Sequence, residues 1–79
     1  MNPDIDSEAY AKLMTDTGTG MKGAQDTPFL TAKEAVVAAI EARASGRFSM
    51  VNVWIEGWGI VEFPQIEELR DLWVAKIED

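Results

Sequence analysis

The stretch VWIEGWGIVEF, residues 53–63, limits the possible folds of this chain more than any other segment. Large apolar residues alternate with polar or aromatic ones on both sides of a Gly-Trp-Gly sequence, which is typical of a β-hairpin. We therefore predict strands over residues 48–56 and 60–63. In a chain of 79 residues, one face of such a hairpin is expected to stay in contact with solvent.

The length of the turn decides which residues of the hairpin pair. A two-residue turn would pair Val53 with Glu62 and place a carboxylate in an apolar face. A three-residue turn over residues 57–59 instead forms apolar pairs, Ile55 with Val61 and Val53 with Phe63. Gly59 can adopt the left-handed conformation needed at the end of such a turn. The sequence therefore favours the three-residue turn.

This register gives the hairpin one apolar face and one mixed face. The predicted inner face holds Val51, Val53, Ile55, Val61 and Phe63. The predicted outer face holds Phe48, Met50, Asn52, Trp54, Glu56, Ile60 and Glu62, with Trp58 at the tip of the turn. Because two strands alone form a weak sheet, we expect helices to cover the inner face.

Two helices are indicated on either side of the hairpin. Residues 31–45 begin with Thr-Ala-Lys-Glu, a capping box, and are followed by Gly46, a typical helix C-cap. The expected buried stripe of this helix is Val36, Val37 and Ile40. A second amphipathic pattern, which starts with a proline, predicts a helix over residues 64–78.

The first thirty residues give weaker signals. Ile5, Ala9 and Leu13 recur four apart, so we predict a helix over residues 3–16 and a Gly-rich loop over residues 17–30. The expected fold is a small α+β single domain over residues 1–79. Its predicted order is α-loop-α-β-β-α, with a two-stranded antiparallel hairpin packed on helices.

Charge and composition exclude several classes of function. Fourteen acidic against seven basic residues give a net charge of −7, which disfavours direct binding of nucleic acids or membranes and favours basic protein surfaces. The chain has no cysteine and no histidine, which removes disulfides, ordinary zinc sites and Cys–His or Ser–His nucleophiles. We therefore expect a non-enzymatic protein without metal or cofactor. The absence of a secretory signal or long apolar run predicts a cytoplasmic location.

Two short motifs lack the residues or the structural context that their binding sites require. Residues 18–23 match G-x-G-x-x-G, but a helix rather than a strand is predicted before them and no βαβ unit is expected around them. Residues 4–15 begin like a calcium-binding EF-hand loop, but Ala9 and Thr15 stand where glycine and glutamate are required.

The outer hairpin face and the last helix supply the candidate contact residues. Trp54, Trp58 and Ile60, rimmed by two glutamates, form a candidate contact patch, although the first predicted helix could also cover them. The last helix carries an acidic ridge, which is formed by Glu67, Glu68, Asp71 and Glu78. This ridge is either a docking surface or simply a solvated face. The predicted partner-binding residues are Trp54, Glu56, Trp58, Ile60, Glu62, Glu67, Glu68 and Asp71.

In size, acidity and helix–hairpin–helix layout, the chain resembles small acidic phage-encoded inhibitors, including many anti-CRISPR proteins. The resemblance implies a nuclease or another nucleic-acid-binding complex as the partner and transfers no functional residue. Our first hypothesis is an acidic protein that binds a basic surface as an inhibitor or nucleic-acid mimic. The alternative is an assembly module, either a homodimer or a small subunit, that buries the aromatic hairpin face. The third hypothesis is an enzyme that uses carboxylate side chains.

Overall fold

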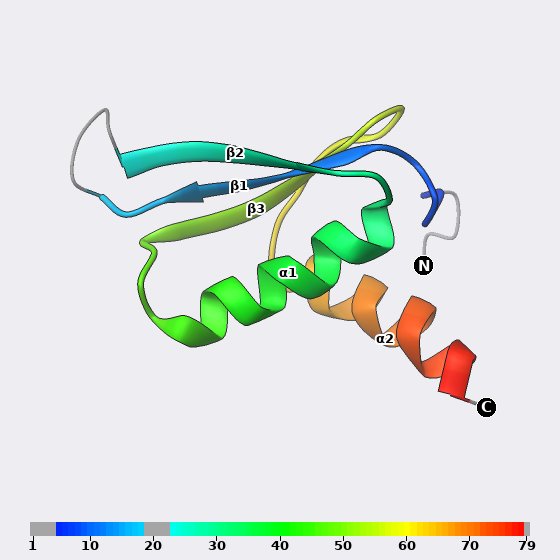
Figure 1. Cartoon of the computed structure of the whole chain (residues 1–79). Coiled ribbons are helices and arrows are strands. Elements are labelled where there is room, and N and C mark those ends of the chain that lie inside the picture. Colours follow the sequence, from blue (N-terminus) through cyan, green and yellow to red (C-terminus); the bar gives the residue numbers. More distant parts are fainter. Residues whose placement is uncertain (1–4, 19–22, 79) are drawn as a thin grey trace.

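A four-stranded antiparallel sheet packs against two helices in the computed structural model, which describes residues 5–18 and 23–78, and side chains as far as Trp73. The elements are β1 (Ala11–Asp16), β2 (Ala24–Phe29), α1 (Ala32–Ser45), β3 (Met50–Ile55), β4 (Gly59–Val61) and α2 (Gln65–Glu78) (Figure 1). The α+β class is confirmed. The order β-β-α-β-β-α differs from the predicted α-loop-α-β-β-α, and the sheet has four strands rather than two.

The predicted helix over residues 3–16 is wrong where the structure describes it, because residues 11–16 form strand β1. Buried and half-buried residues alternate along β1, with Ala11, Leu13 and Thr15 buried. This period of two lets β1 pair on both sides, with β2 on one edge and β3 on the other. The two pairings satisfy backbone groups that a helix would satisfy internally. Residues 3 and 4 lie outside the described part.

The predicted loop over residues 17–30 contains the edge strand β2. The Thr17 N–H donates to the Gly23 carbonyl at 3.1 Å, so residues 17 and 23 form a hydrogen-bonded pair. Because such pairs alternate with non-hydrogen-bonded ones, the backbone polar groups of Ala24, Asp26 and Pro28 point away from β1, toward the free edge. Pro28 has no N–H, so it is tolerated only at a free edge of this kind. The centre of the G-x-G-x-x-G motif, residues 19–22, lies outside the described residues.

The turn between β3 and β4 has the predicted three-residue length but lies one position earlier, over residues 56–58. The observed pairs are Val53 with Val61, Trp54 with Ile60, and Ile55 with Gly59, so both predicted pairs are wrong. The Trp58 N–H donates to the Ile55 carbonyl at 3.0 Å, and Gly57 takes the positive φ of 83° that this turn requires. Because the register differs by two residues, each side chain keeps its predicted face.

Helix α1 begins and ends as its sequence predicts. The Thr31 hydroxyl accepts from the Glu34 N–H at 3.2 Å, and Gly46 adopts φ 75° while its N–H donates to the Arg43 carbonyl. The buried face is made of Ala32, Ala35, Val36 and Ala39. Val37, expected in the buried stripe, is exposed instead. Small alanine side chains allow the helix backbone to lie close to the sheet.

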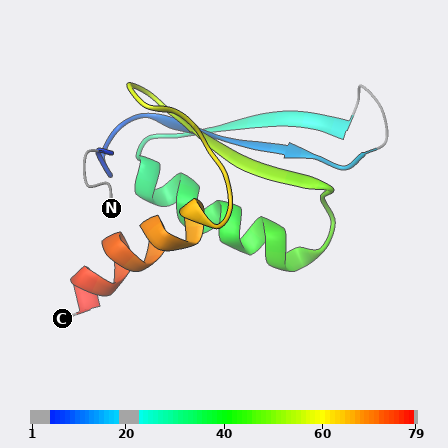
Figure 2. The same ribbon diagram turned by 180° about the vertical axis from the view of Figure 1, so that it is seen from behind.

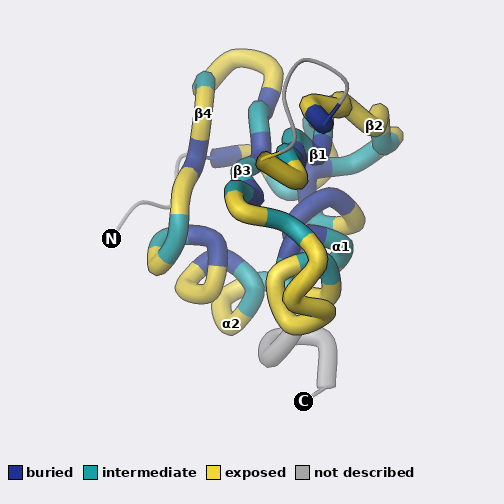
Figure 3. Tube along the Cα trace, turned by 90° about the vertical axis from the view of Figure 1, so that its left-hand side faces the viewer, coloured by how far each residue is buried: buried dark blue, intermediate teal, exposed yellow. Residues whose placement is uncertain are grey.

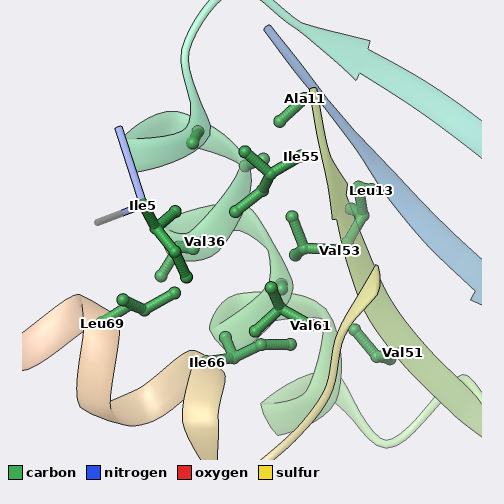
Figure 4. Close-up of a cluster of buried hydrophobic side chains, with 13 residues drawn as sticks. Ile5, Ala11, Leu13, Val36, Val51, Val53, Ile55, Val61, Ile66 and Leu69 are labelled. Carbon is green, nitrogen blue, oxygen red and sulfur yellow. The ribbon is translucent and has the colours of Figure 1, made fainter. Parts of the chain in front are cut away.

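Both helices lie on the same side of the sheet, as the two opposite views show (Figures 1 and 2). Between them and the sheet lies the hydrophobic core, in which Ile66 and Leu69 of α2 approach Val36 of α1 and Val61 of β4 (Figure 4). Phe63, predicted on the inner face, is half-buried at its margin. The other side of the sheet is covered by no described helix. No helix in the described part is long and apolar enough to cross a bilayer.

Substitution of two isoleucines of the hairpin tests which side of the sheet is covered. Ile55 is fully buried, whereas Ile60 on the neighbouring strand is 55% exposed. Ile55→Ala is expected to lower the free energy of unfolding by about 2–4 kcal/mol because it leaves a cavity. Ile60→Ala is expected to cost less than about 1 kcal/mol. Urea denaturation at low protein concentration measures both, and an equal cost would show that the outer face is covered.

Candidate functional site

The side of the sheet opposite the helices presents a contiguous set of outward-facing side chains, here called the open sheet face. Strand alternation and register bring them together from three strands and from the residue before β1. The open sheet face consists of Tyr10, Lys12, Met14, Asn52, Trp54 and Ile60, and is flanked on β2 by Asp26 and Pro28. Buried residues alternate with less buried ones along β1 and β3, as the chain trace coloured by burial shows (Figure 3).

Trp54 lies at the centre of the open sheet face. Its cross-strand partners are Lys12 on β1 and Ile60 on β4. The Tyr10 ring meets the Trp54 ring edge-on, with centroids 6.4 Å apart and planes inclined at 73°. The Lys12 Nζ lies 5.5 Å from the Trp54 ring centroid. The sequence prediction omits Tyr10 and Lys12 because it assigns a helix to residues 3–16, although the alternating pattern of β1 is the signal that places them.

The turn between β3 and β4 extends this surface beyond the end of the sheet. Trp58 is 46% exposed at the turn, and its neighbour Glu56 is exposed as well. The Glu56 N–H donates to the Tyr10 carbonyl at 2.9 Å, which ties the start of the turn to β1. Five of the predicted contact residues thus lie on or beside the open sheet face: Trp54, Glu56, Trp58, Ile60 and Glu62.

The remaining predicted residues belong to a different surface. Glu67, Glu68 and Asp71 are exposed on α2, whose Ile66 and Leu69 pack into the core from the other side of the sheet. The acidic ridge and the open sheet face are therefore separate surfaces that point in different directions. The Glu78 side chain, also expected in the ridge, lies outside the described side chains.

The basic side chains contact aromatic rings more often than carboxylates. Three of them lie over rings, with distances from the cationic atom to the ring centroid: Arg43 over Phe63 at 4.3 Å, Arg47 over Phe48 at 5.5 Å, and Lys12 over Trp54 at 5.5 Å. Within the described residues the only ion pair joins Arg70 and Asp71, which are adjacent in sequence and have side chains 39% and 71% exposed. Most exposed carboxylates therefore have no cation beside them, which favours a negative surface potential.

A shallow depression of about 560 Å³ lies along the outer side of α1, lined in part by Glu8, Glu34 and Glu41. It includes none of the predicted contact residues. Across the residues that the structure describes, no three acidic side chains converge closely enough to hold a metal ion. These three glutamates are useful as controls, since they carry equal charge on a surface distinct from both the open sheet face and the acidic ridge.

Comparison with protein-family models, with curated proteins and with solved structures finds no match for the chain. The function is therefore inferred from the geometry of the chain itself.

Collisional quenching of tryptophan fluorescence tests the charge around the turn. Trp58 is exposed beside Glu56, so caesium ions should reach it more often than iodide ions at low ionic strength. The Trp58 contribution is the difference between wild type and Trp58→Phe. The ratio of the caesium to the iodide quenching constant for Trp58 is expected to be at least about twice the ratio for free N-acetyltryptophanamide. Added salt should reduce this difference. Equal quenching by both ions at low salt would contradict this charge distribution.

Proposed function

We propose that this chain is a non-enzymatic, acidic protein-binding module that docks on a basic surface of a protein partner, through the open sheet face and the adjacent turn. The observation that carries the proposal is the placement of Trp54, Trp58 and Ile60 beside Glu56 and Glu62, on a face that none of the described helices covers. Large aromatic side chains contribute much of the binding energy at protein interfaces.

The negative charge supports a partner that normally binds nucleic acid. A net charge of −7 attracts surfaces rich in lysine and arginine, and it speeds association with them. The likeness to small acidic phage-encoded inhibitors points the same way. We infer an inhibitor or nucleic-acid mimic that acts in the cytoplasm on a nuclease or another nucleic-acid-binding complex. The lack of histidine and cysteine supports a non-enzymatic role.

The test is binding to a panel of purified nucleases and nucleic-acid-binding proteins with basic grooves, at low and high salt, with duplex DNA as competitor. We expect salt-sensitive binding to at least one member, which duplex DNA prevents. Glu56→Gln combined with Glu62→Gln and Trp58→Ala should weaken binding at least about tenfold, because each exposed ion pair and an interfacial tryptophan contribute to affinity.

The control for overall charge is Glu8→Gln with Glu34→Gln and Glu41→Gln, which removes three negative charges from the depression on α1, one more than the hairpin variant loses. A third variant, Glu67→Gln with Glu68→Gln and Asp71→Asn, removes three from α2. If only overall charge matters, the α1 variant and the α2 variant lower the affinity for the partner equally. If the ridge is part of the interface, the α2 variant lowers it more. Binding of no panel member at low salt would contradict the proposed function.

The second candidate function is an assembly module, and the apolar centre of the open sheet face is the observation that favours it. A second copy or a larger subunit could bury Trp54 and Ile60. The β2 edge is a poor site for strand pairing because Pro28 has no N–H to offer there and Asp26 adds a charge. The other edge strand, β4, is only three residues long, so a face-to-face contact is favoured over an edge-to-edge one. A solution mass that stays near 8.7 kDa at all concentrations rules out the homodimer.

A further inference from the structure

The Trp54 ring carries a cation from its own chain. Lys12 stands directly opposite Trp54 in the β1–β3 register, and its Nζ lies 5.5 Å from the ring centroid. This distance is within the range of a cation–π interaction. Both residues are half-buried, so neither is fully withdrawn from solvent. The face of Trp54 is therefore a place where a positive group already rests.

Two further groups lie near this cation, besides its β2 neighbour Pro28. Tyr10 is the outward-facing residue before Lys12, and its ring is inclined at 73° to the Trp54 ring, so the two rings form a corner. Glu56 follows Trp54 by two residues, about 7 Å along the strand, and is exposed. The aromatic face of Trp54 and a nearby carboxylate favour a bound cation, and the Tyr10 ring borders the site.

An arginine is a better occupant of this corner than Lys12. A guanidinium is planar and weakly hydrated, and it stacks on aromatic faces, whereas an ammonium is compact and strongly hydrated. The chain itself illustrates the difference, since Arg43 approaches the Phe63 centroid to 4.3 Å. Lys12 has a flexible side chain and, within the described residues, no ion pair to hold it in place. Its displacement should therefore cost little.

We propose that Trp54 and Tyr10 form a slot for an arginine side chain of a basic protein partner, and that Lys12 occupies this slot in the free chain and leaves it on binding. This inference rests on the proposed function, because it identifies the partner group that the open sheet face recognises. The negative charge of the surroundings, with Glu56 beside the slot, is complementary to such a partner. Lys12 acts as an internal competitor.

The experiment measures affinity by calorimetry for an oligoarginine peptide and an oligolysine peptide of equal length, at low salt, using the full chain. Wild type is expected to prefer oligoarginine. Lys12→Met should strengthen oligoarginine binding about threefold beyond the gain from Lys33→Met, which changes net charge equally but lies on α1. Lys12 is partly exposed, so this variant is expected to fold normally.

A second pair of variants tests the ring itself. Trp54→Leu should weaken oligoarginine binding about threefold to tenfold and bring the two peptides to similar affinity. Trp58→Leu makes the same change at the turn and should leave the preference for arginine in place. Circular dichroism confirms that both variants keep the fold.

The outcomes separate the slot from the wider function. If Lys12→Met and Lys33→Met change the affinity for oligoarginine equally, or if Trp54→Leu folds and keeps the preference for arginine, the proposed slot is wrong. The proposal that the chain docks on a basic surface is not contradicted by either result. If neither peptide binds wild type at low salt, both proposals are wrong. If Trp54→Leu instead converts a dimer to a monomer, the open sheet face binds a second copy of the chain, and the slot is again wrong.

Discussion

The antiparallel pairing of β1 with β3 is the constraint on which the rest of the structure depends. It runs over six residue pairs, from Ala11 with Ile55 to Asp16 with Met50. Because side chains alternate along both strands, this one register sends Leu13 and Val53 into the core and Lys12 and Trp54 to the opposite side. The alanine face of α1 then closes over the core side. The open sheet face is thus fixed by the same pairing that builds the core.

The electrostatic character of the molecule follows from where its few cations lie. In the described part, Arg43, Arg47 and Lys12 each contact an aromatic ring, so these positive groups do little to neutralise the surrounding carboxylates. The aromatic side chains are thereby linked to the charge pattern, since rings hold the cations and leave the acidic groups free. A surface that combines exposed tryptophan with unpaired carboxylate is well suited to a partner rich in arginine.

Sequence reasoning worked where local chemistry decides the structure. The cap of α1 depends on Thr31 and Gly46 alone, and the faces of the β3–β4 hairpin depend only on alternation, so both were predictable. The first thirty residues were not, because β1 is stabilised by distant partners and β2, with its Asp26 and Pro28, has a composition that strands usually avoid. That error also hid half of the candidate site. Trp54 was found from its own strand, whereas its neighbours Tyr10 and Lys12 come from β1.

The most direct measurement is the pattern of nuclear Overhauser effects around β1. The hydrogen bond from Glu56 to Tyr10 makes Leu13 and Val53 a non-hydrogen-bonded pair, whose α-protons lie close together in an antiparallel sheet. The account predicts a strong α-proton contact between Leu13 and Val53, together with side-chain contacts between Lys12 and the Trp54 ring. Sequential helical contacts across residues 11–16, with no contact to β3, would contradict it and remove both the sheet and its open face.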